Sequence, residues 1–268
     1  MKYAPHLPPA LKGVTFNVQP QEKVGVVGRT GSGKSTLLLA LYRMFNLESG
    51  AIIIDGIDIS TLSLPQLRRG LSVIPQEPVV FSGTVRSNLD PFTEYGTDAD
   101  LWDVLNQVGL ADHVTNIGGL DAKVDSVAQS WSLGQAQLMC LARAALKKVP
   151  VLCLDEATAA MDPATEQLVL DIIRRIFADR TTFTIAHRLD TVIESDQVVV
   201  MEAGELAEMA PSHVLLSNPE SMFSKLVDRT GPEGAAALRN AAREYYERTK
   251  GGAPETEVAP APARDMLP

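Results

Sequence analysis

A glycine-rich segment at residues 28–35, which reads GRTGSGKS, is the part of the chain best equipped for chemistry. It fits the pattern G-x-x-x-x-G-K-[ST], in which glycines let backbone N–H groups turn inward around phosphate oxygens. We expect the side chain of Lys34 to reach the β- and γ-phosphates of a nucleotide, and the hydroxyl of Ser35 to hold Mg²⁺. An apolar run at 24–27 precedes the segment and a helical pattern follows it, so an ordinary glycine turn is the less favoured interpretation.

Two neighbouring carboxylates, Asp155 and Glu156, form a second candidate site. They follow the apolar run at 151–154, which predicts a buried strand. Ligands of open α/β sheets bind beyond the carboxyl ends of the strands. Asp155 is therefore expected to support Mg²⁺ through water, and Glu156 to orient or deprotonate an attacking water. By themselves the two could be solvated carboxylates at a strand end, but a phosphate loop needs a metal-binding acid of this kind.

The uncharged stretch QSWSLGQAQ at 129–137 is a third candidate. Ser132 and Gln135 have the spacing of a capping box at the start of a helix. The Ser132 hydroxyl and the backbone N–H groups near Gly134 would then form an anion site without a formal charge. The capping role and the anion-binding role are compatible, because capping supplies the geometry that an anion would use.

The elements that must position these residues follow from the hydrophobic pattern. Strands alternate with helices, which implies an α/β fold with a mainly parallel sheet and helices on both faces. Expected strands are 11–18, 24–27, 51–55, 151–155 and 181–186, with a strand-turn-strand over 196–208; expected helices are 34–45, 98–110, 135–148, 164–177 and 235–250.

Composition narrows the function classes. The net charge of −9 and pI of about 5.0 argue against a nucleic-acid partner, which usually meets a basic face. No run of 18 apolar residues is present, so no membrane-spanning helix is expected. Cys140 and Cys153 lie in apolar surroundings and are expected to be reduced core residues. The segment 251–268 is rich in Pro, Ala and Gly and is expected to be disordered.

The ordered motifs resemble the ATP-binding domain of an ABC transporter over residues 3 to about 230. The resemblance implies that Tyr3 stacks on adenine and that Gln76, in IPQEPVVF, touches Mg²⁺. It also implies that SWSLGQ is the signature motif, with Ser132, Gly134 and Gln135 facing the ATP of a partner domain. Asp162, in AAMD, would lie at the dimer seam, and His187, in TIAHRLD, would contact the γ-phosphate.

The resemblance also sorts the site residues by role. Implied catalytic residues are Glu156, His187, Lys34 and Gln76, and implied Mg²⁺ ligands are Ser35, Gln76 and Asp155. Implied ATP contacts are Tyr3, Gly28, Arg29, Thr30, Gly31, Ser32, Gly33, Lys34, Ser35, Thr36, Ser132, Gly134, Gln135 and Asp162. The implied fold is a P-loop NTPase with a RecA-like core, an N-terminal antiparallel β subdomain and an α-helical subdomain inserted at about 84–149. The cassette would span 1–230, and a helix with a disordered tail would follow at 231–268.

The finer match is to subfamily C, the multidrug-resistance-associated type, and to its second nucleotide-binding domain. It is carried by EKVGVVGRTGSGKS, LRRGLSVIPQEPVVFSGTVRSNLDPF and LCLDEATAAMD. The chain departs from this subfamily with SVAQSW before the signature and with Ala136 where arginine is usual, which predicts a weaker contribution to the partner's site. Gln21 stands where glycine is usual, which predicts a strained turn. The start at Met1, two residues before Tyr3, resembles a fragment.

The function that this resemblance implies is ATP hydrolysis that powers export through separate transmembrane domains at the cytoplasmic face of a membrane. The cassette would work as a nucleotide-sandwich dimer with a second cassette. The alternatives are a truncated or regulatory cassette that binds ATP with little turnover, and a soluble ABC ATPase without a transport role.

Overall fold

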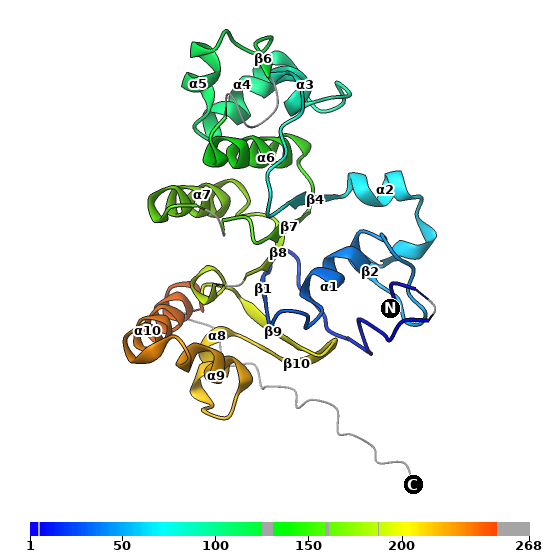
Figure 1. Ribbon diagram of the computed structural model, residues 1–268, viewed down its shortest axis with the longest axis vertical. Helices are drawn as coiled ribbons and strands as arrows, with labels where there is room; N and C mark the ends of the chain where they lie inside the picture. The colour runs from blue at the N-terminus through cyan, green and yellow to red at the C-terminus, as the bar shows by residue number, and fades with distance from the viewer. Residues whose placement is uncertain (5, 125–130, 159–160, 187, 251–268) are drawn as a thin grey trace.

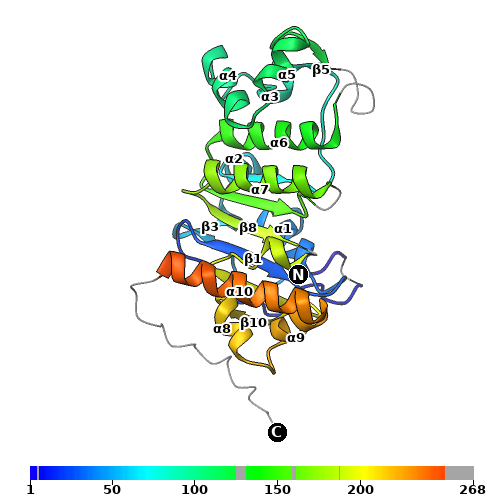
Figure 2. The ribbon, with the colours of Figure 1, turned by 90° about the vertical axis from the view of Figure 1, so that its left-hand side faces the viewer.

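The architecture is a six-stranded sheet flanked by helices. A computed structural model describes residues 1–4, 6–124, 131–158, 161–186 and 188–250. The sheet order is β10-β9-β1-β8-β7-β4, with only β10 antiparallel to its neighbour. In Figures 1 and 2 the helices α3–α6 lie at one end of the molecule and α8–α10 at the other. The predicted α/β fold with a mainly parallel sheet is confirmed.

The strands are β1 (Lys23–Val27), β2 (Ile53–Ile54), β3 (Ile57–Asp58), β4 (Leu71–Ile74), β5 (Gly83–Thr84), β6 (Lys123–Val124), β7 (Val151–Asp155), β8 (Thr181–Ile185), β9 (Gln197–Glu202) and β10 (Glu205–Ala210). The α-helices are α1 (Lys34–Leu41), α2 (Leu64–Arg69), α3 (Val85–Leu89), α4 (Asp98–Gln107), α5 (Ala111–Asn116), α6 (Leu133–Lys147), α7 (Pro163–Ile176), α8 (Ser212–Ser217), α9 (Met222–Asp228) and α10 (Gly231–Lys250). Short 3₁₀ helices η1 (Ile59–Thr61) and η2 (Leu189–Thr191) join them.

The register of the parallel strands brings four loops to one edge of the sheet. Val26 pairs with Ile185, Ile185 pairs with Asp155, and Leu154 pairs with Ile74. The carboxyl ends of β1, β8, β7 and β4 therefore meet at the same edge, which is where ligands of such sheets bind.

The central strands are apolar because helices cover both faces of the sheet. Val26 of β1 and Leu152 of β7 are fully buried. Cys153 is buried beside them, and desolvation raises the pKa of its thiol to about 12. Cys140 is also a buried free thiol, so the prediction of two reduced core cysteines is confirmed.

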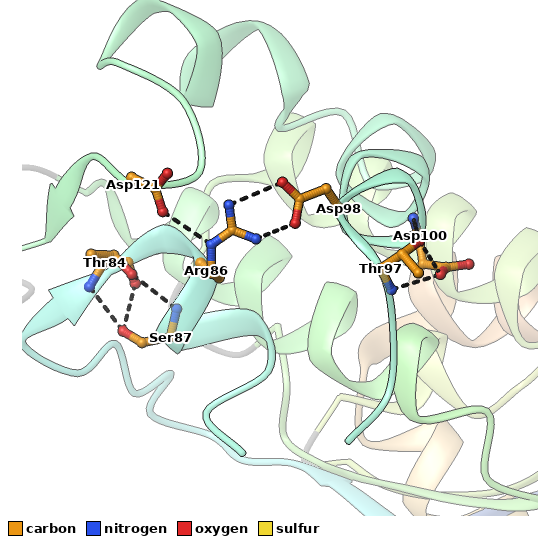
Figure 3. A network of polar contacts seen from close by, with 7 residues as sticks. All are labelled: Thr84, Arg86, Ser87, Thr97, Asp98, Asp100 and Asp121. Carbon is orange, nitrogen blue, oxygen red and sulfur yellow. Dashed lines mark hydrogen bonds and ion pairs between the residues drawn. The ribbon is translucent and has the colours of Figure 1, made fainter. Parts of the chain in front are cut away.

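The helices α3 and α4 are joined by an arginine network. Arg86 of α3 pairs with Asp98 of α4 and with Asp121, as Figure 3 shows. The same view shows two capping boxes, in which Thr84 caps α3 and Thr97 caps α4. These caps satisfy backbone N–H groups that would otherwise have no partner at the helix starts.

The strand predicted over 11–18 does not form. Val14 and Val18 pack against a core cluster that includes Val24 and Leu38, but residues 13–18 take part in no strand pairing among the described residues. A strand requires a neighbour for its hydrogen bonds, and alternation in the sequence cannot supply one. The antiparallel pairing in this part of the chain is confined to the short pair β2 and β3.

Two local predictions have different outcomes. The helix predicted over 34–45 ends at Leu41, because Arg43 has a positive φ of 46° and donates to the carbonyls of Ile59 and Leu62. Gln21 has φ 65°, which confirms that the turn before β1 requires the left-handed region that favours glycine. The predicted disorder of 251–268 concerns a segment outside the described residues.

Candidate functional site

The glycine-rich loop between β1 and α1 is shaped as a receptor for an anion. Gly28, Gly31 and Gly33 have φ values of 151°, 79° and 105°, which other residues rarely adopt. A Cβ on Gly28 would lie 2.3 Å from the Met201 carbonyl oxygen, so only glycine fits there. Gly33 is the N-cap of α1 and supplies no side-chain cap. The first N–H groups of α1 are therefore left for another acceptor.

Lys34 stands at the first position of α1 and bends back over the loop. Its Nζ donates to the carbonyl oxygens of Gly28 at 2.9 Å and Arg29 at 3.3 Å. Burial lowers the pKa of Lys34, while the charges of Glu156 and Asp155 oppose this shift. This opposition shows that the two carboxylates of the second candidate site lie within electrostatic reach of the loop lysine.

Tyr3 lies beside the same helix. Its hydroxyl is 2.6 Å from Thr36 Oγ1, and its ring packs edge-on against Phe45 with centroids 5.0 Å apart. Tyr3 as a residue is 42% exposed, which leaves part of its surface available for stacking. The structure thus places an aromatic residue from the N-terminal segment beside α1, the helix that follows the phosphate loop.

The acidic pair follows β7. Asp155 is the last residue of β7, and the Glu156 backbone N–H donates to the Ile185 carbonyl at 3.0 Å. Glu156 has φ 50°, an unfavourable conformation for a residue with a side chain. Such strain costs about 1–3 kcal/mol.

Two further expected residues follow neighbouring strands. Gln76 comes two residues after β4 and its side chain is exposed. His187 lies outside the described residues. Among the described residues, no group of three or more His, Cys, Asp and Glu side chains is arranged to hold a metal. A Mg²⁺ ion here would need the Ser35 hydroxyl and phosphate oxygens beside Asp155, which are hard oxygen donors of the type it prefers.

The predicted cap at Ser132 forms. Ser132 Oγ accepts from the Gln135 N–H at 3.2 Å, and Gln135 Oε1 accepts from the Ser132 N–H at 2.9 Å. A Cβ on Gly134 would lie 2.8 Å from Thr165 Cγ2, so this glycine allows α6 to pack closely on α7. Ala136 is fully buried in α6 and therefore faces the core rather than the cap.

Asp162 caps the neighbouring helix. Its Oδ1 accepts from the N–H groups of Ala164 and Thr165 at the start of α7. Hydrogen bonding with Thr165 lowers the pKa of Asp162. Through the contact of Gly134 with Thr165, the caps of α6 and α7 form one surface. No hydrogen bond or ion pair among the described residues joins this surface to the glycine loop.

The motifs that line these two surfaces match a known family. Residues 11–159, more than half of the 268-residue chain, match the family model described as ABC transporter. The chain belongs to the ABC transporter family. A relative from Dictyostelium discoideum, "ABC transporter C family member 3", is 47% identical over 244 residues, which cover 91% of this chain and 17% of that protein. "ATP-binding cassette sub-family C member 4" of Homo sapiens is 47% identical over 245 residues, which cover 91% of this chain and 18% of that protein.

A solved structure supports the same assignment. The structure of a bacterial Atm1-family ABC exporter with ATP bound matches with a TM-score of 0.78 and 32% identity, covering 86% of this chain and 40% of that chain. The predicted resemblance to ABC subfamily C is confirmed by the curated relatives. This cassette spans less than a fifth of the length of those two relatives. None of the helices described for it is long and apolar enough to cross a membrane.

The cassette also contains polar residues that no motif singled out. Glu166 of α7 is buried, and it contacts Thr158, after β7, and Arg188, after β8. In the sequence, a glutamate within an amphipathic helix is typical of a solvated face. Its burial could not be predicted, because it depends on partners 8 and 22 residues away.

Proposed function

We propose that this cassette binds ATP with Mg²⁺ and hydrolyses the ATP to power export through transmembrane domains. The observation that carries the proposal is the uncapped start of α1 beneath three positive-φ glycines, with Lys34 at its first position. A helix start of this kind offers N–H donors and a positive dipole end to phosphate groups. The family, whose solved member has ATP bound, supports ATP as the nucleotide.

The nucleotide would lie along the loop and α1. Tyr3 would stack on the adenine, since this partly exposed residue is held next to Thr36 by a hydrogen bond. On phosphate binding, Lys34 would exchange the carbonyls of Gly28 and Arg29 for the β- and γ-phosphates, which are stronger acceptors. The remaining proposed ATP contacts on this surface are Gly28, Arg29, Thr30, Gly31, Ser32, Gly33, Ser35 and Thr36.

Hydrolysis would take place at the carboxyl ends of β7 and β8. Glu156 would accept a proton from, or orient, the water that attacks the γ-phosphate. Lys34 would stabilise the charge that develops on the phosphate, and Gln76 and His187 would hold the γ-phosphate in place. Bound Mg²⁺, with Ser35, Gln76 and Asp155 around it, would supply further charge neutralisation.

A second cassette would complete the site. Ser132, Gly134 and Gln135 at the start of α6 would face the γ-phosphate of an ATP bound to the partner, and Asp162 would lie at the seam. This arrangement is supported by the separation of the two surfaces within one chain. The partner would be the first cassette of the same transporter or a second copy, and this chain would correspond to a second nucleotide-binding domain.

We further propose that the cassette lies at the cytoplasmic face of a membrane, attached to transmembrane domains supplied by other sequence. The much greater length of the curated relatives supports this. The proposed division is a cassette over 1–230, with a helical subdomain at about 84–149, and a C-terminal part over 231–268. The acidic net charge of −9 supports the absence of a nucleic-acid partner.

The test is the substitution Glu156→Gln, with Glu205→Gln on the exposed face of β10 as a control. We expect Glu156→Gln to retain Mg-ATP binding, to lower turnover at least about a hundredfold and to trap an ATP-bound dimer. The control should match the wild type in binding, turnover and dimerisation. If the wild type binds Mg-ATP without turnover, the alternative of a regulatory cassette is favoured. If Glu156→Gln turns over ATP at the wild-type rate, Glu156 does not have the proposed catalytic role. A chain that does not bind Mg-ATP would refute the proposal.

A further inference from the structure

A buried carboxylate on α7 connects the two loops that leave β7 and β8. The side chain of Glu166 is 6% exposed. Its Oε1 accepts a hydrogen bond from Thr158 Oγ1 at 3.0 Å, and its Oε2 lies 2.5 Å from Arg188 Nη1. One carboxylate therefore contacts one residue from each loop.

The two loops begin side by side. Asp155 at the end of β7 pairs with Ile185 at the end of β8, and the Glu156 N–H donates to the Ile185 carbonyl. Thr158 and Arg188 each stand three residues beyond their strand. The same loops carry Glu156 and, in sequence, His187, to which the proposed function assigns the attacking water and the γ-phosphate.

Beside the direct contact of Glu156 with Ile185, the described residues of the two loops and α7 border a small pocket. A cavity of about 40 Å³ lies there, lined among others by Glu156, Thr158, Ile185 and Arg188. A loop that borders a cavity has room to shift, so its position depends on the contacts that remain. For both loops one of these contacts is the carboxylate of Glu166.

The contact between Glu166 and Arg188 is an ion pair in which the carboxylate is buried. A buried carboxylate that loses its cation is left without compensation, so Arg188 is held in place. Arg188 Nη2 also lies 2.6 Å from Asp190, which is half exposed. Arg188 is itself 52% exposed, so solvent screens both pairs; they differ in that Glu166, at 6% exposed, would be left buried without a cation if its pair were lost.

We propose that Glu166 is a positioning residue that sets the placement of Thr158 after β7 and Arg188 after β8 relative to each other, and with them Glu156. The inference rests on the proposed function for its catalytic consequence. The mechanical link itself is independent of catalysis, because it follows from contacts present in the chain alone.

The link is tested by hydrogen–deuterium exchange on the whole chain. Thr158→Val removes the hydroxyl that donates to Glu166 and leaves the Glu156 N–H to Ile185 carbonyl bond in place, so increased exchange at residues 188–192 would indicate the Glu166 contact. We expect Thr158→Val and Glu166→Gln each to raise exchange at 188–192 about threefold or more. Asp190→Asn, which removes the exposed partner of the same arginine, is the matched control and should change it less. Unchanged exchange at 188–192 in both variants, or an equal rise in Asp190→Asn, would overturn the link.

The catalytic consequence is tested by steady-state kinetics. Glu166→Gln should leave the Kd for Mg-ATP within about twofold of the wild type and lower kcat about tenfold, and Glu166→Asp should restore part of the loss. Thermal unfolding verifies that each variant is folded at the assay temperature. An active wild type with an unchanged kcat in Glu166→Gln would overturn the positioning role. A wild type without turnover would instead count against the proposed hydrolysis, and the exchange experiment would still decide the link.

Discussion

The cap of α6 is expected to have two separable roles, and Ser132→Ala tests both. In the folded chain the substitution removes the hydrogen bond from the Gln135 N–H to Ser132 Oγ, which is 3.2 Å long. Loss of such a cap costs about 1 kcal/mol of unfolding free energy, within a range of about 0.5–2 kcal/mol. For a chain of this size the thermal midpoint should fall by about 2–4 °C per kcal/mol.

The second role is to bind the partner's nucleotide. A hydroxyl that donates to a phosphate contributes about 1.5–3 kcal/mol, because its acceptor is charged. In a symmetric dimer with two such sites, Ser132→Ala should therefore weaken ATP-dependent association by at least about a hundredfold. Sedimentation in Mg-ATP, with Glu156→Gln present in both proteins to prevent turnover, measures this dissociation constant.

The matched control is Thr97→Ala. Thr97 caps α4 with the same kind of box, in which Thr97 Oγ1 accepts from the Asp100 N–H at 3.5 Å and donates to Asp100 Oδ2 at 2.7 Å, and α4 is not part of either proposed nucleotide surface. It should lose a similar amount of stability and keep ATP-dependent association. Equal weakening of association in both variants, or no weakening in Ser132→Ala, would refute the reasoning, because the α6 cap would then be structural only.

Two further predictions concern the loop and the helical end. Gly28→Ala should destabilise the fold by about 1–3 kcal/mol more than Gly31→Ala in urea unfolding, because a Cβ meets the Met201 oxygen at 2.3 Å at Gly28 and nothing within 4 Å at Gly31; equal losses would contradict the steric argument. Arg86 lowers the pKa of Asp98 below its unfolded value, so their pair stabilises the chain at neutral pH and this stabilisation is lost as pH falls through the folded pKa. The stability difference between wild type and Asp98→Asn should therefore shrink in thermal unfolding between pH 6 and about pH 3, and a difference independent of pH would contradict this.

The sequence predicted the central strands because their signal is local. The apolar residues of β1 and β7 are a direct consequence of burial on both faces, and periodicity reports burial. The strand expected over 11–18 failed for the opposite reason, since alternation reports a half-buried face but not a hydrogen-bonded neighbour. The early end of α1 depends on contacts from Arg43 to carbonyls 16 and 19 residues away, which no local pattern contains.

In the candidate site too, features set by local sequence were predictable and features set by distant contacts were not. The glycine loop and the Ser132 cap are contiguous segments whose geometry follows from their own residues, so both were predictable. Glu166 was not, because its importance comes from Thr158 and Arg188, which reach it from two different loops. A residue whose role is to connect segments is visible only when the segments are placed in space.

This placement suggests how the two nucleotide surfaces could influence each other. The glycine loop precedes α1, which packs in the cluster that contains Val24 and Leu38. The α6 cap belongs to a separate cluster that contains Met139 and Val169. Strands β4 and β7 contribute residues to both clusters, and Glu166 of α7 contacts Thr158 after β7 and Arg188 after β8. A shift of α6 and α7 on meeting a partner's nucleotide would therefore reach Glu156 through Glu166 and Thr158.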